Sequence, residues 1–157
     1  METARAIKAQ SSVPFIFRAG VWKPRTSPSS FQGAGEEALA WLKEVKDTFG
    51  VSVATEVATP EHVALALNAG IDYLWIGART SANPIAVQTI ADALTANSQK
   101  PKALLIKNPV NADAALWIGN IERLENQNFA DAANLLAHGN FFFVKQNPNV
   151  RRLCNLI

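Results

Sequence analysis

The sequence predicts an α/β protein of parallel (βα) repeats, equivalent to about half of a (βα)8, or TIM, barrel. Short, continuously apolar segments, typical of strands buried on both faces, alternate with amphipathic segments of helical periodicity. Strands that alternate with helices form a parallel sheet. An open doubly wound sheet fits the same pattern. A complete barrel needs about 200 residues or more, so a chain of 157 residues can supply only part of one.

The first elements follow the chain in order. Residues 1–9 predict a helix, and the apolar residues 13–17 predict the first strand. Residues 36–48 carry leucine and valine at helical spacing, and Gly50 follows as a stop. Residues 51–57 are apolar and rich in β-branched side chains, so they predict the second strand.

The segment after the second strand predicts a helix that starts near residue 60. Thr59 and Pro60 suit the N-cap and first helical positions, and Gly70 suits the stop of a helix that ends at residue 69. Residues 73–76 then predict the third strand, because this short run is apolar and aromatic.

The same alternation continues beyond the third strand. Asn83 and Pro84 predict the start of a helix through residue 94, and residues 103–106 predict the fourth strand. Asn111 is expected to cap a helix at 112–124.

The regular pattern fades after residue 124. Residues 129–137 are compatible with one more short helix, and residues 138–157 show no clear periodicity. We therefore expect residues 1–125 to form the partial barrel and residues 126–157 to form a divergent tail.

Charge and composition exclude several classes of protein. The net charge is only +2, and basic residues are interspersed with acidic ones, so we expect no nucleic-acid partner. A single cysteine, Cys154, excludes an internal disulfide and a cysteine-rich zinc site, and it favours the cytoplasm. No apolar run approaches the roughly 18–20 residues of a membrane span. We expect a soluble, unprocessed protein with no membrane partner.

Basic residues follow three predicted strands at the end where parallel folds bind ligands. Arg18, Lys23 and Arg25 follow the first strand. Arg79 follows the third strand, and Lys107 follows the fourth. Because the carboxyl ends of parallel strands share one edge, we expect these cations to converge there. Guanidinium and ammonium groups suit phosphate and carboxylate oxygens, so the sequence predicts a substrate with more than one such group. Loop cations that are merely solvated are the alternative.

Other polar residues lie near the same strand ends. Thr26, Ser27 and Thr80 could donate hydroxyl hydrogen bonds. Glu56 ends the second strand, where it could act as an acid or base, although a structural partnership with an arginine is the favoured interpretation. His62 is expected at the surface of a first helical turn, with no spacing that suggests a metal site.

Three segments resemble one enzyme family in the same order. They are RAGVWKPRTSPSSFQG at 18–33, IGARTSANP at 76–84 and LLIKNPVNADAALWIG at 104–119. Together they resemble type I 3-deoxy-7-phosphoheptulonate (DAHP) synthases, close to the bacterial branch that is sometimes fused to chorismate mutase. The resemblance covers about residues 1–125 and corresponds to the middle portion of those enzymes.

The resemblance implies a transferase with a (βα)8 barrel that condenses phosphoenolpyruvate with erythrose 4-phosphate and releases phosphate. This reaction opens the shikimate pathway to chorismate and the aromatic amino acids. It implies that Lys23 to Thr26 contact erythrose 4-phosphate, and that Lys23 and Lys107 are the catalytic candidates. Arg18, Ala78, Arg79 and Lys107 would then bind phosphoenolpyruvate. The implied substrate-binding residues are Arg18, Lys23, Pro24, Arg25, Thr26, Ala78, Arg79 and Lys107.

The resemblance also implies a divalent metal that polarises the aldehyde. The family's ligands are a cysteine before the KPRT segment and a histidine, a glutamate and an aspartate on the last strands. This sequence has no counterpart for them, and Cys154 lies in a different region. Residues 138–141, HGNF, only distantly echo a His-Arg-Gly-Phe segment of the family. We therefore expect a truncated form with phosphate-binding residues but no metal ligands.

Two further interpretations stay open. The chain could be a noncatalytic phosphometabolite-binding module, or a half-barrel that assembles with another chain, including as a homo-oligomer. The related 3-deoxyoctulosonate 8-phosphate synthases share the barrel and the use of phosphoenolpyruvate. The KPRT segment favours the heptulonate family, because the octulosonate family has a different, asparagine-containing loop there.

Overall fold

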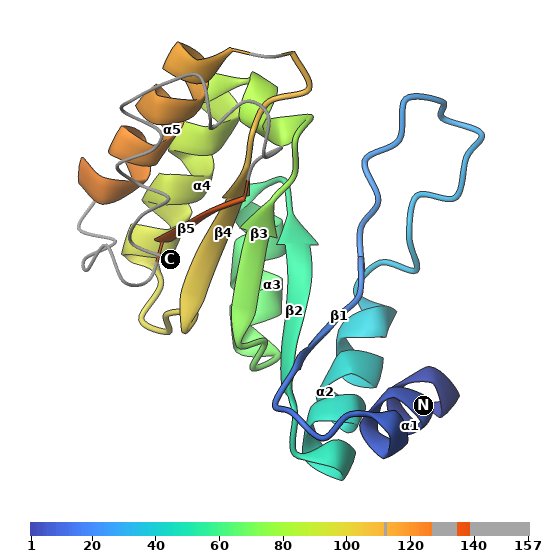
Figure 1. The fold of residues 1–157 in the computed structure, drawn as a ribbon. Helices are drawn as coiled ribbons and strands as arrows, with labels where there is room; N and C mark the ends of the chain where they lie inside the picture. Colours follow the sequence, from blue (N-terminus) through green and yellow to red (C-terminus); the bar gives the residue numbers. More distant parts are fainter. Residues whose placement is uncertain (112, 127–134, 139–157) are drawn as a thin grey trace.

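The strands form a parallel sheet in which order along the chain equals order in space (Figure 1). The structure is a computed structural model that describes residues 1–111, 113–126 and 135–138. Its strands are β1 (Ile16–Arg18), β2 (Ser52–Val57), β3 (Tyr73–Ile76), β4 (Ala103–Lys107) and β5 (Leu135–His138). A doubly wound sheet would reverse its order at a switch point. The unbroken order β1-β2-β3-β4-β5 is that of a barrel segment, which confirms the predicted partial barrel.

The connecting helices cover one side of this sheet (Figure 1). They are α2 (Glu37–Phe49), α3 (Pro60–Asn68), α4 (Pro84–Ala96) and α5 (Ala114–Asn126), with a short 3₁₀ helix η1 (Thr80–Ala82) before α4. Helix α1 (Glu2–Gln10) precedes β1 and lies beside α2. Alternate strand residues face the helices and are fully buried, among them Val53, Leu74 and Ile106. No helix within the described residues is long and apolar enough to span a membrane.

The other side of the sheet carries several residues of the candidate site. Glu56 is level with Trp75, and Trp75 is level with Leu105, so these side chains point to the same face. By the same alternation Arg18 and Lys107 lie on this face, away from the helix-covered core. In a closed barrel this side would be the interior.

Two predicted helix starts are confirmed. The Thr59 hydroxyl accepts the N–H of His62 at 3.2 Å, and α3 begins at Pro60. The Asn83 side chain accepts the N–H groups at the start of α4, at 3.0 and 3.3 Å. Both caps satisfy backbone donors that a helix end leaves open.

The first strand differs from its prediction at 13–17. It spans Ile16–Arg18, so Arg18 belongs to the strand itself. Pro14 has no backbone N–H for a sheet ladder, and Val13 is 66% exposed. The apolar run therefore begins before the strand does.

The predicted cap of the last clear helix was also wrong. Asp113 caps α5 rather than Asn111, because its carboxylate accepts the N–H of Leu116 at 2.9 Å. The helix consequently starts at Ala114. Two residues of the same capping class stand close together, and side-chain chemistry alone does not separate them.

The short helix predicted at 129–137 is contradicted where the structure describes it. Leu135–His138 is a strand, paired with β4 from Leu104↔Leu135 to Lys107↔His138. Pairing with an available strand edge overrode the local propensity of an alanine- and leucine-containing segment. Residues 127–134 and 139–157, including Cys154, lie outside the described residues.

An aspartate joins several elements at the amino ends of the strands. Asp72 Oδ1 lies 3.0 Å from Lys46 Nζ and 2.9 Å from Lys102 Nζ, and its Oδ2 accepts the N–H of Val53 at 3.1 Å. Burial acts to raise the pKa of Asp72, but the hydrogen bonds from Lys102, Val53 and Lys46 outweigh it and lower the pKa below its ordinary value.

Asp72→Ala is expected to lower the free energy of unfolding by about 1–3 kcal/mol, because the buried N–H of Val53 loses its acceptor. Asp47→Ala is the control, since Asp47 forms an exposed ion pair with Lys43 and should change stability by less than about 1 kcal/mol. The contribution of Asp72 should be complete above the ordinary aspartate pKa of 3.8 and disappear as the pH falls through its lower folded-state pKa. Urea titrations of both variants at neutral and acidic pH measure this. An equal loss in the two variants would contradict it.

Candidate functional site

The loop between β1 and α2, residues 19–35, carries most of the predicted site residues and is called the KPRT loop below. Its base is tied to the sheet, since the N–H of Val21 donates to the buried Thr55 hydroxyl at 3.2 Å. Its two arms are tied to each other. The N–H of Lys23 donates to the carbonyl of Gln32 at 2.7 Å, and the N–H of Gly35 donates to the carbonyl of Val21 at 3.1 Å. The loop therefore has a defined path at its base.

Two cations of the KPRT loop have different surroundings. The half-buried Lys23 side chain lies over Gly20, where an added Cβ would be 2.6 Å from Nζ. Arg25 is exposed, and its Nε–H donates to the carbonyl of Phe31 at 3.4 Å within the same loop. The half-buried Pro24 lies between them. Lys23 thus lies close to the strand end, whereas Arg25 is engaged farther out in the loop.

Loops after different strands meet at the carboxyl end of the sheet. Arg79 Nη2 donates to the Thr26 hydroxyl at 3.1 Å, which links the segment after β3 to the KPRT loop. The N–H of Val110 donates to the carbonyl of Ala78 at 3.2 Å, which links the segments after β3 and β4. Predicted site residues that are far apart in sequence are thereby joined.

Arg18 rests on an aromatic ring that the sequence did not single out. Its guanidinium carbon lies 4.8 Å from the centroid of the Trp75 ring. Trp75 Nε1 donates to Glu56 Oε2 at 3.1 Å, and the other oxygen of that carboxylate lies against Gly77. Glu56 forms no ion pair with an arginine in the described part of the chain, contrary to the favoured interpretation. It instead orients the ring beneath Arg18.

Trp75 was missed because it lies inside an apolar strand, where the one-dimensional pattern indicates only burial. Its register with Glu56 could have identified it, since level residues of parallel strands point to the same face. That register depends on the pairing of two strands, which the sequence alone does not give.

Lys107 ends β4 and is half-buried. Within the described residues its ammonium forms no hydrogen bond or ion pair, and the same holds for the Lys23 ammonium. Lys46 and Lys102, at the opposite end of the strands, both bind Asp72. A partly buried ammonium group with no carboxylate beside it among the described residues is stabilised when an anionic ligand binds there.

The turn that carries Ala78 and Arg79 is supported from below by α5. The N–H and hydroxyl of Ser81 donate to the carbonyl of Gly77 at 2.9 and 3.0 Å. The fully buried Asn120 donates its Nδ2–H to the carbonyl of Ser81 at 2.7 Å. The position of Arg79 therefore depends on a buried polar contact as well as on β3.

The predicted hydroxyl donors have different fates. Thr26 contacts Arg79. Ser27 instead pairs with the hydroxyl of Ser29 at 2.8 Å, and Thr80 is buried at the start of η1 with 8% of its surface exposed. Thr26 is thus the predicted hydroxyl that joins two segments of the candidate site.

His62 is half-buried, so its predicted surface position was wrong. Its ring stacks on Trp22 of the KPRT loop with centroids 3.9 Å apart and planes inclined by 5°. Its Nδ1 accepts the N–H of Ala58 at 3.3 Å. Burial lowers the pKa of His62, and the charge of Glu61 only partly opposes this. The sequence could not show the stack, because its partners lie on a loop and a helix with a strand between them.

The described residues do not fit a divalent metal. No group of three or more His, Cys, Asp or Glu side chains comes together among them. Glu56 binds the Trp75 indole, and Asp72 lies at the far end of the strands with two lysines. No step of a reaction is therefore assigned to a metal here.

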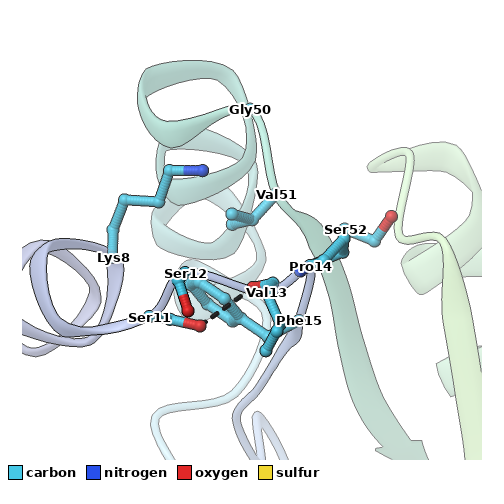
Figure 2. A pocket seen from close by; sticks show the side chains of 9 residues that line it. All are labelled: Lys8, Ser11, Ser12, Val13, Pro14, Phe15, Gly50, Val51 and Ser52. Atoms are coloured by element: carbon cyan, nitrogen blue, oxygen red, sulfur yellow. Dashed lines mark hydrogen bonds between the residues drawn. The ribbon is translucent and has the colours of Figure 1, made fainter.

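A pocket of about 410 Å³ opens at the amino ends of β1 and β2, away from these strand ends (Figure 2). Lys8 reaches toward it from α1, and the Ser11 hydroxyl donates to the carbonyl of Val13 at 2.9 Å beside it. A smaller, mainly apolar pocket of about 190 Å³ lies among α1, β1 and α2. None of the predicted site residues lines either pocket.

Known proteins resemble this chain in sequence and in fold. A phospho-2-dehydro-3-deoxyheptonate aldolase of Thermotoga maritima is 41% identical over 68 residues, which is 43% of this chain and 20% of that protein. A 2-dehydro-3-deoxyphosphooctonate aldolase of a Synechococcus strain is 47% identical over 55 residues, which is 34% of this chain and 19% of that protein. The matched segments are thus about a fifth of these relatives' lengths.

The crystal structure of the Thermotoga maritima phospho-2-dehydro-3-deoxyheptonate aldolase (DAHP synthase) superposes with a TM-score of 0.66 and 25% identity. The superposition covers 87% of this chain and 35% of that protein, so this chain spans about a third of its length. The sequence profile of the DAHP synthetase I family matches residues 1–150. The chain belongs to the DAHP synthetase I family.

Proposed function

We propose that the carboxyl ends of the strands bind phosphoenolpyruvate and erythrose 4-phosphate, as in a 3-deoxy-7-phosphoheptulonate synthase. The observation that carries this proposal is the contact between Arg79 and Thr26, which joins two family motifs at one edge of the sheet. It is supported by the ammonium groups of Lys23 and Lys107, which have no hydrogen-bond or ion-pair partner among the described residues, and by the placement of Arg18 beside Trp75. Family membership supports this substrate class over an unrelated anion.

Each implied residue then has a distinct role. Arg18, Arg79 and Lys107 bind the phosphate and carboxylate of phosphoenolpyruvate, with the backbone at Ala78 close to the phosphate. The segment from Lys23 to Thr26 binds erythrose 4-phosphate, and Lys23 also reaches phosphoenolpyruvate. The fork of Arg79 is suited to two phosphate oxygens at once, whereas the lysines act as point charges.

We further propose that this chain is a truncated, cytoplasmic form of the enzyme. Alone it binds phosphoenolpyruvate but does not condense it with the aldehyde. The poor fit of the described residues to a metal supports this. The division into residues 1–125 and a divergent 126–157 is retained as a proposal. Strand β5 at Leu135–His138 nevertheless continues the sheet beyond residue 125.

The binding proposal predicts that Arg79→Ala and Lys107→Ala each weaken phosphoenolpyruvate binding by about tenfold or more, equivalent to about 1.4 kcal/mol. Each removes one cationic side chain, with its hydrogen bonds, from a partly desolvated anion. Titration calorimetry of the purified chain measures the affinities. Lys43→Ala is the control, because Lys43 is an exposed cation that pairs with Asp47 on α2.

Equal affinities in all three variants would overturn the assignment of the binding residues. A separate assay addresses catalysis. Sustained phosphate release that requires both substrates would overturn the proposal that this chain alone does not condense them.

The octulosonate relatives favour a second candidate function, the eight-carbon chemistry that their name states. The discriminating feature is the KPRT segment. The heptulonate proposal predicts that Thr26→Ala, which removes the Arg79 contact, weakens erythrose 4-phosphate binding more than binding of 2-dehydro-3-deoxyphosphooctonate. The half-barrel interpretation predicts pairing with another chain through the edge of β1 that has no partner strand within the described residues. Such pairing would show as an oligomer in solution mass measurements.

A further inference from the structure

An aromatic stack connects the KPRT loop to a helix that carries none of the predicted substrate contacts. Trp22 of the loop and His62 in the first turn of α3 lie 3.9 Å apart, centroid to centroid, with nearly parallel planes. Parallel rings whose centroids are 3.9 Å apart are in van der Waals contact over their faces, so each side chain packs against the other. The stack therefore restrains where this part of the loop can lie.

His62 is the fixed partner of the pair. Its backbone N–H donates to the Thr59 hydroxyl at 3.2 Å, within the capping contact that starts α3. Its ring Nδ1 accepts the N–H of Ala58 at 3.3 Å. The ring is thus anchored at its backbone and at one nitrogen, and the proton of the neutral ring is assigned to Nε2.

Trp22 is directly bonded to Lys23, and both of its neighbours in the chain are held by hydrogen bonds. The preceding residue, Val21, is 1% exposed and donates its N–H to Thr55. The following residue, Lys23, donates its N–H to Gln32 across the loop. Because Trp22 lies between these two residues, the stack of its ring on His62 adds a third restraint to the backbone that carries Lys23.

We propose that His62 is a positioning residue for the KPRT loop, fixing Lys23 through the Trp22 ring. This inference rests on the proposed function, because it assigns His62 to the site that binds the phosphorylated substrates. His62 itself touches neither substrate. It acts by restricting the loop before binding, which reduces the ordering cost of a bound anion.

Two variants separate the stack from the histidine chemistry. His62→Ala removes the ring, whereas His62→Phe retains an aromatic face but loses the acceptor for Ala58. Glu61→Gln is the matched control, since it changes the adjacent exposed residue and leaves the stack intact. Trp22→Phe tests the other half of the pair.

The first measurement is hydrogen exchange at the Lys23 amide, followed by NMR without ligand. His62→Ala should accelerate this exchange by about three- to tenfold. His62→Phe should restore most of the protection, and Glu61→Gln should leave it unchanged. Rescue by phenylalanine is not expected if His62 acts only through its contact with Ala58.

The second measurement is the phosphoenolpyruvate affinity of the same variants. His62→Ala should weaken binding by about three- to tenfold, and His62→Phe should restore it. If the unaltered chain fails to bind phosphoenolpyruvate, the proposed function fails, while the exchange measurement still tests the positioning of Lys23. If His62→Ala does not fold, Trp22→Phe against Trp22→Ala gives the same comparison. Unchanged Lys23 exchange after loss of either ring would overturn the inference.

Discussion

Trp117→Ala is expected to lower the free energy of unfolding by about 3–5 kcal/mol. The side chain lies on α5, is 0% exposed and belongs to the hydrophobic core. Removing the indole leaves a large cavity in addition to the lost burial, and neighbouring helices relax only partly into such space. Chemical denaturation monitored by circular dichroism measures the loss.

Two controls assign this loss to the cavity. Trp41→Ala removes the same side chain from α2, where it is 51% exposed, and should cost about 1 kcal/mol or less. Trp117→Phe keeps an aromatic ring and leaves a smaller cavity, so it should cost less than Trp117→Ala. The indole Nε1–H of Trp117 finds no acceptor within the described part of the chain, so phenylalanine sacrifices no hydrogen bond. A similar loss for Trp41→Ala and Trp117→Ala would contradict the placement of α5 in the core.

The Trp117 variant also tests how the site is supported. Asn120 lies one turn further along α5 and contacts the carbonyl of Ser81, next to the turn that carries Arg79. A loosened α5 should therefore weaken phosphoenolpyruvate binding in conditions where the chain is still folded. The buried Asn120 amide thus links the stability of α5 to the position of the turn that carries Arg79.

The fold was largely predictable because its signals are local and repeated. Thr59 with Pro60 and Asn83 with Pro84 mark helix starts by side-chain chemistry that works within three residues. Repetition of strand and helix then implied a parallel sheet. Strand β5 escaped prediction, because Leu135–His138 becomes a strand only through pairing with β4.

The candidate site was predictable to a smaller extent. Cations at strand ends are visible in the sequence, since parallel topology brings those ends together. Their actual partners are not visible. The Trp75 ring under Arg18 and the His62 ring against Trp22 depend on register and helix placement. Glu56 shows the same limit, because it binds an indole where the sequence favoured an arginine.

Gly33→Val is expected to open the base of the KPRT loop and weaken binding of both phosphorylated substrates by at least about tenfold. Gly33 has a φ of 101°, which a β-branched residue rarely adopts. An added Cβ would lie 2.1 Å from the carbonyl oxygen of Val21, so backbone must move. Backbone strain of this kind costs about 1–3 kcal/mol, and the displaced carbonyl also loses its hydrogen bond from Gly35.

Gly35→Ala is the control that distinguishes the steric clash with Val21 from the strain of a positive φ. Gly35 also has a positive φ, of 70°, but an added Cβ meets no atom within 4 Å. It should cost about 1–2 kcal/mol, the cost of placing a side chain in the left-handed region, and leave substrate affinity within about twofold. Amide exchange at Lys23 should accelerate in Gly33→Val and remain slow in Gly35→Ala. Because Trp117 lies in the hydrophobic core on α5 and not on this loop, its burial should persist in both variants. If Gly33→Val kept its affinity and its slow exchange, the tied arms of the loop would not be what presents Lys23 to the substrates.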